Sequence, residues 1–409
     1  MTVPKNSAHR QPFAPEGRQS SAPRSAFRRR VSGQPATIGA IMVLIVLVLG
    51  GCAAGGYYWQ AAQGQVDLMA RREPIAQLLA RSELSGELRQ RLATIRDIRN
   101  FAVSSLALPD NGSYRNYVQL DRPYAVWNVF GAPELELTPH EWCYPMVGCL
   151  AYRGYFSESE AVAEAAALRE QGLDSWVAGV PAYSTLGWFD DPVLSTFAHW
   201  PVGRVAELLF HELAHQQLFV AGDTAFNESY ATTVGRAGAE LWLRAHATPE
   251  EQQIYLRQRE ARDRFLNLVM SARAQLEVLY YSELDDGQKR VGKESTLADF
   301  RSGFQQWREL WGGPLLPPDV SRGGNAWFAA IGAYEQWVPA FKVLLEEAGG
   351  DFAAFHQVVA TIAGESESSR LAELEALSQR AAELADGSEH LPAEPTDRLA
   401  DANSSPSYR

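Results

Sequence analysis

The run HELAH at residues 211–215 has the residue types and the spacing of a zinc site. Four residues make about one turn of a helix, so His211 and His215 project from the same face and can bind one ion. Glu212 lies beside the first histidine, where its carboxylate can take a proton from a water activated by the metal. The pattern predicts a metal-dependent hydrolase with Glu212 as its base.

The next helix is expected to supply a third ligand, Glu228. A short segment with Gly222 turns the chain, and Asp223 or Thr224 can cap the helix that follows. Such a helix–turn–helix can return Glu228 to the metal and leave one coordination position open. The alternative is a pair of surface histidines on a solvated helix. The leucines and Phe219 around the motif argue against it, because they predict a buried helix whose polar groups need partners.

Hydrolysis of a peptide bond also needs a hydrogen-bond donor for the negative charge that develops on the carbonyl oxygen. Tyr230 is the first candidate, followed in order by Tyr183, Tyr334 and His199. For each of them, packing is the alternative role.

Candidates for substrate binding lie just before the motif. Tyr183 and Ser184 end a strand-like segment that could pair with an extended peptide. An exopeptidase also needs carboxylates for the free amino group of its substrate, and Asp190, Asp191 and Glu141 are available. An Asp-Asp-Pro sequence is equally typical of a turn or a helix cap.

Hydrophobic periodicity predicts the elements that position these side chains. Apolar residues recur at three- and four-residue steps and indicate helices over 201–219, 225–246, 249–282, 297–310, 325–347 and 352–363. Before them we expect two antiparallel helices within 60–106 that separate near 81–85, a strand-like segment over 113–130, a helix opened by a capping box at 157–160, and a strand over 175–183. The predicted fold class is α+β and mainly α-helical.

The first 51 residues have the features of an export signal. Three arginines at 28–30 precede an apolar stretch over 38–49, which is short for a membrane span but typical of a signal peptide. Small residues then precede Cys52, an arrangement that resembles the lipobox of bacterial lipoproteins. The resemblance implies cleavage before Cys52, a lipid on its sulfur, a tether over 52–60 and a protein anchored to a membrane of the cell envelope, facing the periplasm. An uncleaved membrane anchor is the alternative.

Charge and cysteine usage fit this location. The formal net charge is −12, and residues 1–51 hold seven basic residues and one acidic residue, so the remainder carries −18. A phosphate backbone would repel such a body, which argues against nucleic-acid binding. Cys143 and Cys149 flank a Pro/Gly turn. In an oxidising compartment we expect them to form a disulfide rather than bind a metal.

The sequence NESYA at 227–231 resembles the Asn-Glu-x-x-Ala arrangement of the glutamate zincins, whose third zinc ligand is a glutamate on the helix after HExxH. The resemblance implies a zincin-like metallopeptidase domain that holds one zinc ion through His211, His215 and Glu228. The separation is shorter here, with 12 residues between His215 and Glu228.

A second departure concerns the residue that orients the first histidine. Thr232 stands where the glutamate zincins usually have an acidic residue. Glu207 and Asp223 are the possible substitutes.

A wider resemblance covers roughly residues 57–363. The segments 149–156 and 181–192, together with HELAHQ and FNESYA, resemble a bacterial family of predicted zinc aminopeptidases. It implies a peptide substrate. We expect the peptidase domain over 61–365, followed by an Ala/Glu-rich helix and a disordered tail over 366–409. Two alternatives stay open: a zinc endopeptidase of envelope proteins, and a non-catalytic metal-binding lipoprotein, against which an intact Glu212 argues.

Overall fold

The structure is a computed structural model that describes residues 52–144, 148–182, 184–311 and 324–389. The chain divides into two compact units, Met1–Gly56 and Tyr57–Arg409, and the contacts described below belong to the second. The predicted signal sequence lies outside the described residues. None of the helices in the described part of the chain is long and apolar enough to cross a membrane.

Residues 52–106 contain three helices rather than the predicted two. They are α2 (Cys52–Ala70), α3 (Ile75–Ala80) and α4 (Gly86–Leu106), and the short strand β1 (Glu73–Pro74) separates α2 from α3. Pro74 explains the extra break, because it cannot donate the N–H that a continuous helix requires. Ser85 caps α4 by accepting a hydrogen bond from Leu88 N at 3.3 Å, close to the predicted separation. Residues 52–60, which the sequence predicts to be a tether, form the first part of α2.

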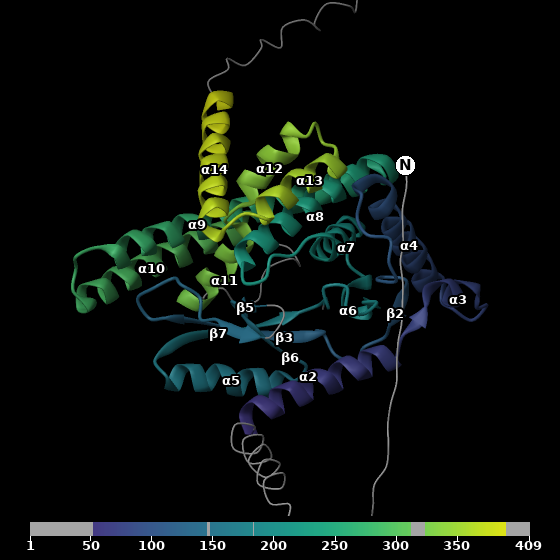
Figure 1. Ribbon diagram of the computed structural model, residues 1–409, viewed down its shortest axis with the longest axis horizontal. Helices are drawn as coiled ribbons and strands as arrows, with labels where there is room; N and C mark the ends of the chain where they lie inside the picture. Colours follow the sequence, from purple (N-terminus) through teal and green to yellow (C-terminus); the bar gives the residue numbers. More distant parts are fainter. Residues whose placement is uncertain (1–51, 145–147, 183, 312–323, 390–409) are drawn as a thin grey trace, which may run out of the picture. The chain divides into compact units, whose positions relative to one another are not determined.

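A three-stranded antiparallel sheet lies between two helices (Figure 1). The strand order is β6 (Arg153–Tyr155), β3 (Val126–Pro133), β7 (Leu173–Val180), and the covering helices are α5 (Glu158–Glu170) and α11 (Asn325–Glu335). Trp127 and Val129 of β3 pack against α5, whereas Phe130 and Ala132 pack against α11. This alternation is the two-residue period of a strand that is buried on both faces. Within the described residues, β7 is an edge strand of this sheet.

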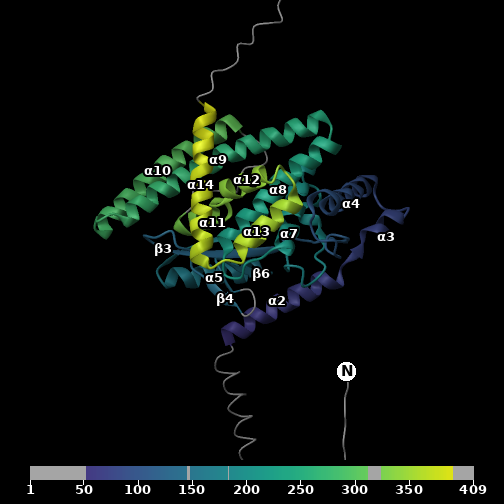
Figure 2. The same ribbon diagram turned by 45° about the horizontal axis from the view of Figure 1, so that its top comes forward.

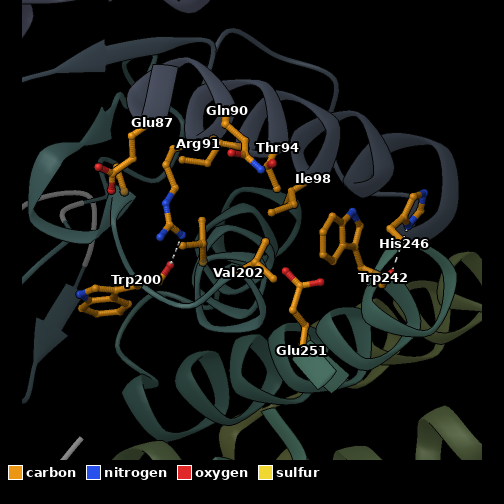
Figure 3. Close-up of a pocket in the computed structure, with 13 residues that line it drawn as sticks. Glu87, Gln90, Arg91, Thr94, Ile98, Trp200, Val202, Trp242, His246 and Glu251 are labelled. Carbon is orange, nitrogen blue, oxygen red and sulfur yellow. Dashed lines mark hydrogen bonds between the residues drawn. The ribbon is translucent and has the colours of Figure 1, made fainter. Parts of the chain in front are cut away.

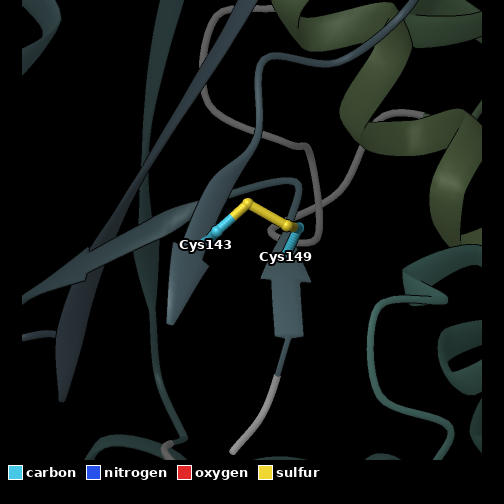
Figure 4. Close-up of a disulfide and its surroundings, with 2 residues drawn as sticks. All are labelled: Cys143 and Cys149. Atoms are coloured by element: carbon cyan, nitrogen blue, oxygen red, sulfur yellow. A yellow bond between two sulfur atoms is a disulfide. The ribbon is translucent and has the colours of Figure 1, made fainter. Parts of the chain in front are cut away.

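Two smaller sheets complete the β structure. The predicted strand over 113–130 is divided, because β2 (Asn116–Val118) pairs with β1 and with β8 (Val193–Leu194) instead of joining β3. β4 (Trp142–Tyr144) and β5 (Gly148–Leu150) form a hairpin in which Cys143 lies opposite Cys149. A disulfide joins the two cysteines (Figure 4).

The metal-ligand candidates lie on two helices in the largest hydrophobic core. α7 (Val202–Gln217) and α8 (Thr224–His246) match the predictions to within two residues. Each contributes a buried stripe at four-residue spacing to the same core: Val205, Leu209 and Leu213 from α7, and Phe226, Tyr230 and Val234 from α8. Burying one such apolar side chain stabilises the fold by about 1.5–3 kcal/mol, so these stripes fix the rotation of both helices.

The remaining helices are α6 (Ser195–Ala198), α9 (Pro249–Tyr281), α10 (Asp286–Trp311), α12 (Val338–Glu347), α13 (Phe352–Ala363) and α14 (Glu367–Glu389). α9 and α10 lie side by side in Figures 1 and 2 and share a core around Phe265 and Phe300. The single helix predicted over 325–347 is two helices, α11 and α12, and Pro339 lies in the first turn of the second. α14 buries Leu374 and Leu377 in the same core as α7 and α8.

Candidate metal centre

The structure brings the three predicted ligands together. His211 Nε2 lies 3.1 Å from His215 Nε2 and 3.2 Å from Glu228 Oε2, and His215 Nε2 lies 3.5 Å from Glu228 Oε2. A tetrahedral zinc ion with bonds of about 2.0–2.1 Å to nitrogen and oxygen would need ligand atoms about 3.3–3.4 Å apart. Two imidazoles and a carboxylate also suit zinc chemically, so the residues present fit this ion.

The electrostatics of the centre also point to a cation. His215 is 7% exposed and Glu228 is 6% exposed, and His215 Nδ1 has no hydrogen-bond partner among the described residues. Burial alone would raise the pKa of Glu228, but the His215 and His211 imidazoles lower it to about 2. Burial opposes a charge on His215, yet Glu228 raises the pKa of His215. The ligand atoms therefore attract a proton where a metal ion would bind, and the two compete.

A tight turn returns Glu228 to the histidines. The Asn227 side chain closes this turn, since its Oδ1 accepts a hydrogen bond from Val220 N at 2.8 Å and its Nδ2 donates to Val220 O at 2.7 Å. Asp223 caps α8 by accepting from Phe226 N at 3.0 Å. Sequence reasoning noticed Asn227 only as part of a motif and missed this positioning role.

The two ligand helices can approach closely because Gly235 lies at their crossing. A Cβ atom on Gly235 would lie 2.7 Å from Glu207 O and 3.2 Å from His211 Cβ. Gly235 is two helical turns beyond Glu228, on the same face of α8. Gly235 therefore sets the distance between α7 and α8 that places Glu228 against the histidines. The positions of residues along the sequence do not indicate this role.

The candidates for carbonyl stabilisation are dispersed. Tyr230 is fully buried, and its hydroxyl is hydrogen-bonded to His356 Nδ1 at 2.9 Å in the core, away from the ligands. His199 is exposed at the end of α6. Tyr183 lies outside the described residues. Tyr334 of α11 is the one that the structure brings to the centre, because its ring stacks on that of His211 with a centroid distance of 6.4 Å.

Neither proposed substitute for an acidic residue beside His211 is free for that role. Glu207 pairs with Arg262 at 2.8 Å and accepts a hydrogen bond from Tyr255 Oη at 3.3 Å. Burial alone would raise the pKa of Glu207, but Arg262 and the other arginines lower it to about 2. Asp223 pairs with Arg370 of α14 at 2.8 Å. Both carboxylates are thus held by arginines rather than by a ligand histidine.

Asp191 is a buried structural acceptor rather than an open carboxylate. It is 1% exposed, and it accepts hydrogen bonds from Thr185 N at 2.9 Å and Thr185 Oγ1 at 2.8 Å, with Ser184 Oγ at 3.4 Å. Burial is the main cause that raises its pKa to about 6. Asp190 is exposed, and its backbone carbonyl accepts from Arg72 Nη1 at 3.0 Å.

Two cavities formed by described residues border the core. The larger, about 340 Å³, lies between α4, α7 and α8 and is drawn in Figure 3; Arg91, Trp200 and Trp242 line it, and none of the metal-ligand candidates does. The smaller, about 250 Å³, is lined by Glu141, by Ala225 one turn before Glu228, and by Ala333. The smaller cavity therefore lies beside the first turn of α8, one turn before Glu228.

Comparison with known proteins places the chain in a peptidase class. Residues 56–374 match a family model described as "Putative aminopeptidase". Because the match covers most of the chain, the chain belongs to that family. No curated protein and no solved structure matches it significantly.

Proposed function

We propose that this protein is a zinc-dependent peptidase that removes amino-terminal residues from peptides. The observation that carries the proposal is the convergence of His211, His215 and Glu228 beside Glu212, in a chain that belongs to an aminopeptidase family. The arrangement of an HExxH helix and a following glutamate helix also supports a zincin-like assignment. An intact Glu212 distinguishes it from a structural metal site, which needs no base beside a ligand.

The residues divide the chemistry between them. A bound zinc ion would act as a Lewis acid that activates water and polarises the scissile carbonyl. Glu212, partly exposed on α7, accepts the proton of the attacking water and returns it to the leaving nitrogen. Tyr334 donates a hydrogen bond to the carbonyl oxygen. Burial and the nearby Glu228 raise the pKa of Tyr334 well above its ordinary value, which keeps this donor protonated at neutral pH.

The substrate-binding surface follows from two features. Among the described residues β7 is an edge strand, so its outer backbone groups can pair with an extended peptide. It ends at Val180, before the segment 183–184 predicted for this pairing. Asp191 is saturated by its own donors, so Glu141 beside the smaller cavity is our candidate for binding the substrate's amino group.

We also propose that the protein acts in the bacterial cell envelope, anchored through a lipid on Cys52. The support is the sequence around Cys52 alone. Expression of Cys52→Ser in a bacterium tests it: labelled lipid should be lost from the protein, which should leave the membrane fraction. Retention of the label would exclude the anchor.

The decisive experiment compares the purified protein with its Glu212→Gln variant. Both should bind one zinc ion, and turnover of a short peptide should fall by about 10²–10⁴-fold in the variant because the base is lost. Gln217→Ala, a substitution of an exposed residue on the same helix, is the control for effects of mutagenesis and purification. N-acetylation of the peptide should abolish cleavage by an aminopeptidase and not by an endopeptidase. Absence of bound metal, or full activity of Glu212→Gln, would refute the proposal.

A further inference from the structure

Tyr114 is an anomalous residue near the centre. Its side chain is 2% exposed, and its hydroxyl is buried without a hydrogen-bond partner among the described residues. Its backbone has φ of 63°, a left-handed conformation that is unfavourable for a bulky side chain. A buried unpaired hydroxyl and a strained backbone both cost stability, and such costs concentrate at functional positions.

The surrounding chain holds Tyr114 in this conformation. Tyr114 N donates to Asp191 O at 2.6 Å, and Asp191 N donates to Ser113 Oγ at 3.3 Å. The buried guanidinium of Arg99 donates through Nε to Ser113 O at 2.9 Å. The segment therefore has little freedom to turn the side chain toward another partner.

Hydrogen bonds connect the same segment to α7, the helix that carries Glu212. Asn111 Nδ2 donates to Gln216 Oε1 at 2.7 Å, and Gln216 Nε2 donates to Asp191 Oδ2 at 3.2 Å. Gln216 lies one turn after Glu212 on α7, so Asn111 and Asp191 bring Tyr114 to the Glu212 side of the helix.

The hydroxyl of Tyr114 lies close enough to two carboxylates, Glu212 and Asp191, for their charges to act on it, and the two differ in the donors that they already have. Asp191 already accepts from Thr185, Ser184 and Gln216. The side chain of Glu212 makes no hydrogen bond to another described residue. Burial, followed by the charges of Glu212 and Asp191, raises the pKa of Tyr114 well above its ordinary value, so the hydroxyl is a donor.

We propose that Tyr114 is a positioning residue whose hydroxyl donates a hydrogen bond to the Glu212 carboxylate and orients it while the metal centre is at work. The inference rests on the proposed function, because it assigns Glu212 as the base. The hydroxyl itself is enclosed, so it acts through Glu212 rather than by touching the substrate. Among the described residues the Tyr114 hydroxyl has no acceptor and the Glu212 side chain has no donor, and the charge of Glu212 acts on that hydroxyl, so the two groups can pair.

The test is a double-mutant cycle on the zinc-loaded protein, with leucine hydroxamate as the probe. This ligand gives up a proton on binding a metal, so its affinity, measured by calorimetry, reports on the neighbouring base. Tyr114→Phe should weaken binding by about 10–100-fold, the range for one hydrogen bond to a charged group, and leave zinc content unchanged. In the Glu212→Gln background the same change should alter affinity by less than about twofold, because coupled residues are not additive.

A second measurement separates this role from packing. Thermal unfolding of the metal-free protein should give an unchanged or higher Tm for Tyr114→Phe, since the hydroxyl that is removed has no partner. Tyr280→Phe is the matched control, because the Tyr280 hydroxyl is buried and donates to Asn325 Oδ1 at 2.8 Å. It should lower Tm and leave hydroxamate affinity unchanged.

Two outcomes would overturn the inference: equal hydroxamate affinity of the parent and Tyr114→Phe, or an equal loss of affinity with and without Glu212. A parent protein that binds neither zinc nor hydroxamate would instead refute the proposed function, and this inference with it. The two failures are thus distinguishable.

Discussion

Two glutamates on α7, five residues apart, have opposite surroundings. Glu207 is enclosed by Arg204, Arg236 and Arg262, and Arg236 in turn binds Glu335 at 2.6 Å. In that network three arginines surround two carboxylates, so the protein itself neutralises both acids. Beside Glu212 the ligand atoms of His211, His215 and Glu228 lie within 4.8 Å of one another, and Glu212 makes no hydrogen bond to another described residue.

The difference indicates which region is structural and which is functional. Buried charges that are neutralised internally stabilise one arrangement of helices. Buried donors and acceptors that converge on one point without internal compensation need something from outside the chain. This contrast, together with the motif, makes the His211–His215–Glu228 group the candidate for binding a metal ion.

The largest expected effect comes from exchanging a ligand carboxylate. Glu228→Gln should lower zinc affinity by more than the 10–100-fold typical of residues outside the ligand set, because a neutral amide is a poor zinc ligand. Competition with a chromogenic chelator measures this affinity. A variant that retains the parent affinity would show that Glu228 is not a ligand.

Glu207→Gln is the matched change in the compensated network. It leaves buried arginines without their carboxylate, which should lower the free energy of unfolding by about 3–5 kcal/mol. Denaturant unfolding measures the loss, and zinc stoichiometry should stay at one. If Glu207→Gln abolished zinc binding in a folded protein, the two regions would not be separate.

Asp191 extends the comparison between compensated and uncompensated carboxylates, because its hydrogen-bond donors are neutral groups rather than arginines. Its pKa is raised to about 6 in the folded state, above an ordinary value of 3.8. Between about pH 4 and 6 the unfolded chain loses this proton first, so the contribution of Asp191 to the free energy of unfolding falls as pH rises, by on the order of 3 kcal/mol. Asp191→Asn should therefore gain stability relative to the parent across this window in denaturant unfolding, and parallel curves would contradict the prediction.

The smallest expected effect is at the helix crossing. Gly235→Ala should push α7 and α8 apart and lower the free energy of unfolding by about 1–3 kcal/mol, with a smaller loss of zinc affinity than Glu228→Gln. Gly86→Ala is the control, because nothing lies within 4 Å of the position its Cβ would take. Unchanged zinc affinity in Gly235→Ala would mean that the helix spacing does not set the ligand geometry.

The residues that sequence could identify are those whose geometry is local. The spacing of His211 and His215 fixes their common face within one helix, and the short turn to Glu228 leaves few paths for the chain. Tyr230 shows the limit of such reasoning: it is two residues beyond Glu228, a rotation of about 200° around a helix, and so points into the core.

The rest depends on contacts between distant segments. Tyr334 reaches His211 from α11, and Tyr114 reaches the α7 helix through Asn111 and Asp191. No period or motif reports such contacts. The left-handed backbone conformation of Tyr114 cannot be predicted from the sequence either, because glycine, asparagine and aspartate are the residues that routinely adopt it.

The ion pair between Asp223 and Arg370 has a consequence for the order of assembly. Asp223 caps the helix that carries Glu228, and Arg370 belongs to α14, the last described helix of the chain. Chains are synthesised from the amino terminus, so the turn between the ligand helices receives this partner only after Arg370, 147 residues beyond Asp223, has been made. Before that point the turn depends on local hydrogen bonds, those of Asn227 with Val220 and the Asp223 cap on Phe226 N.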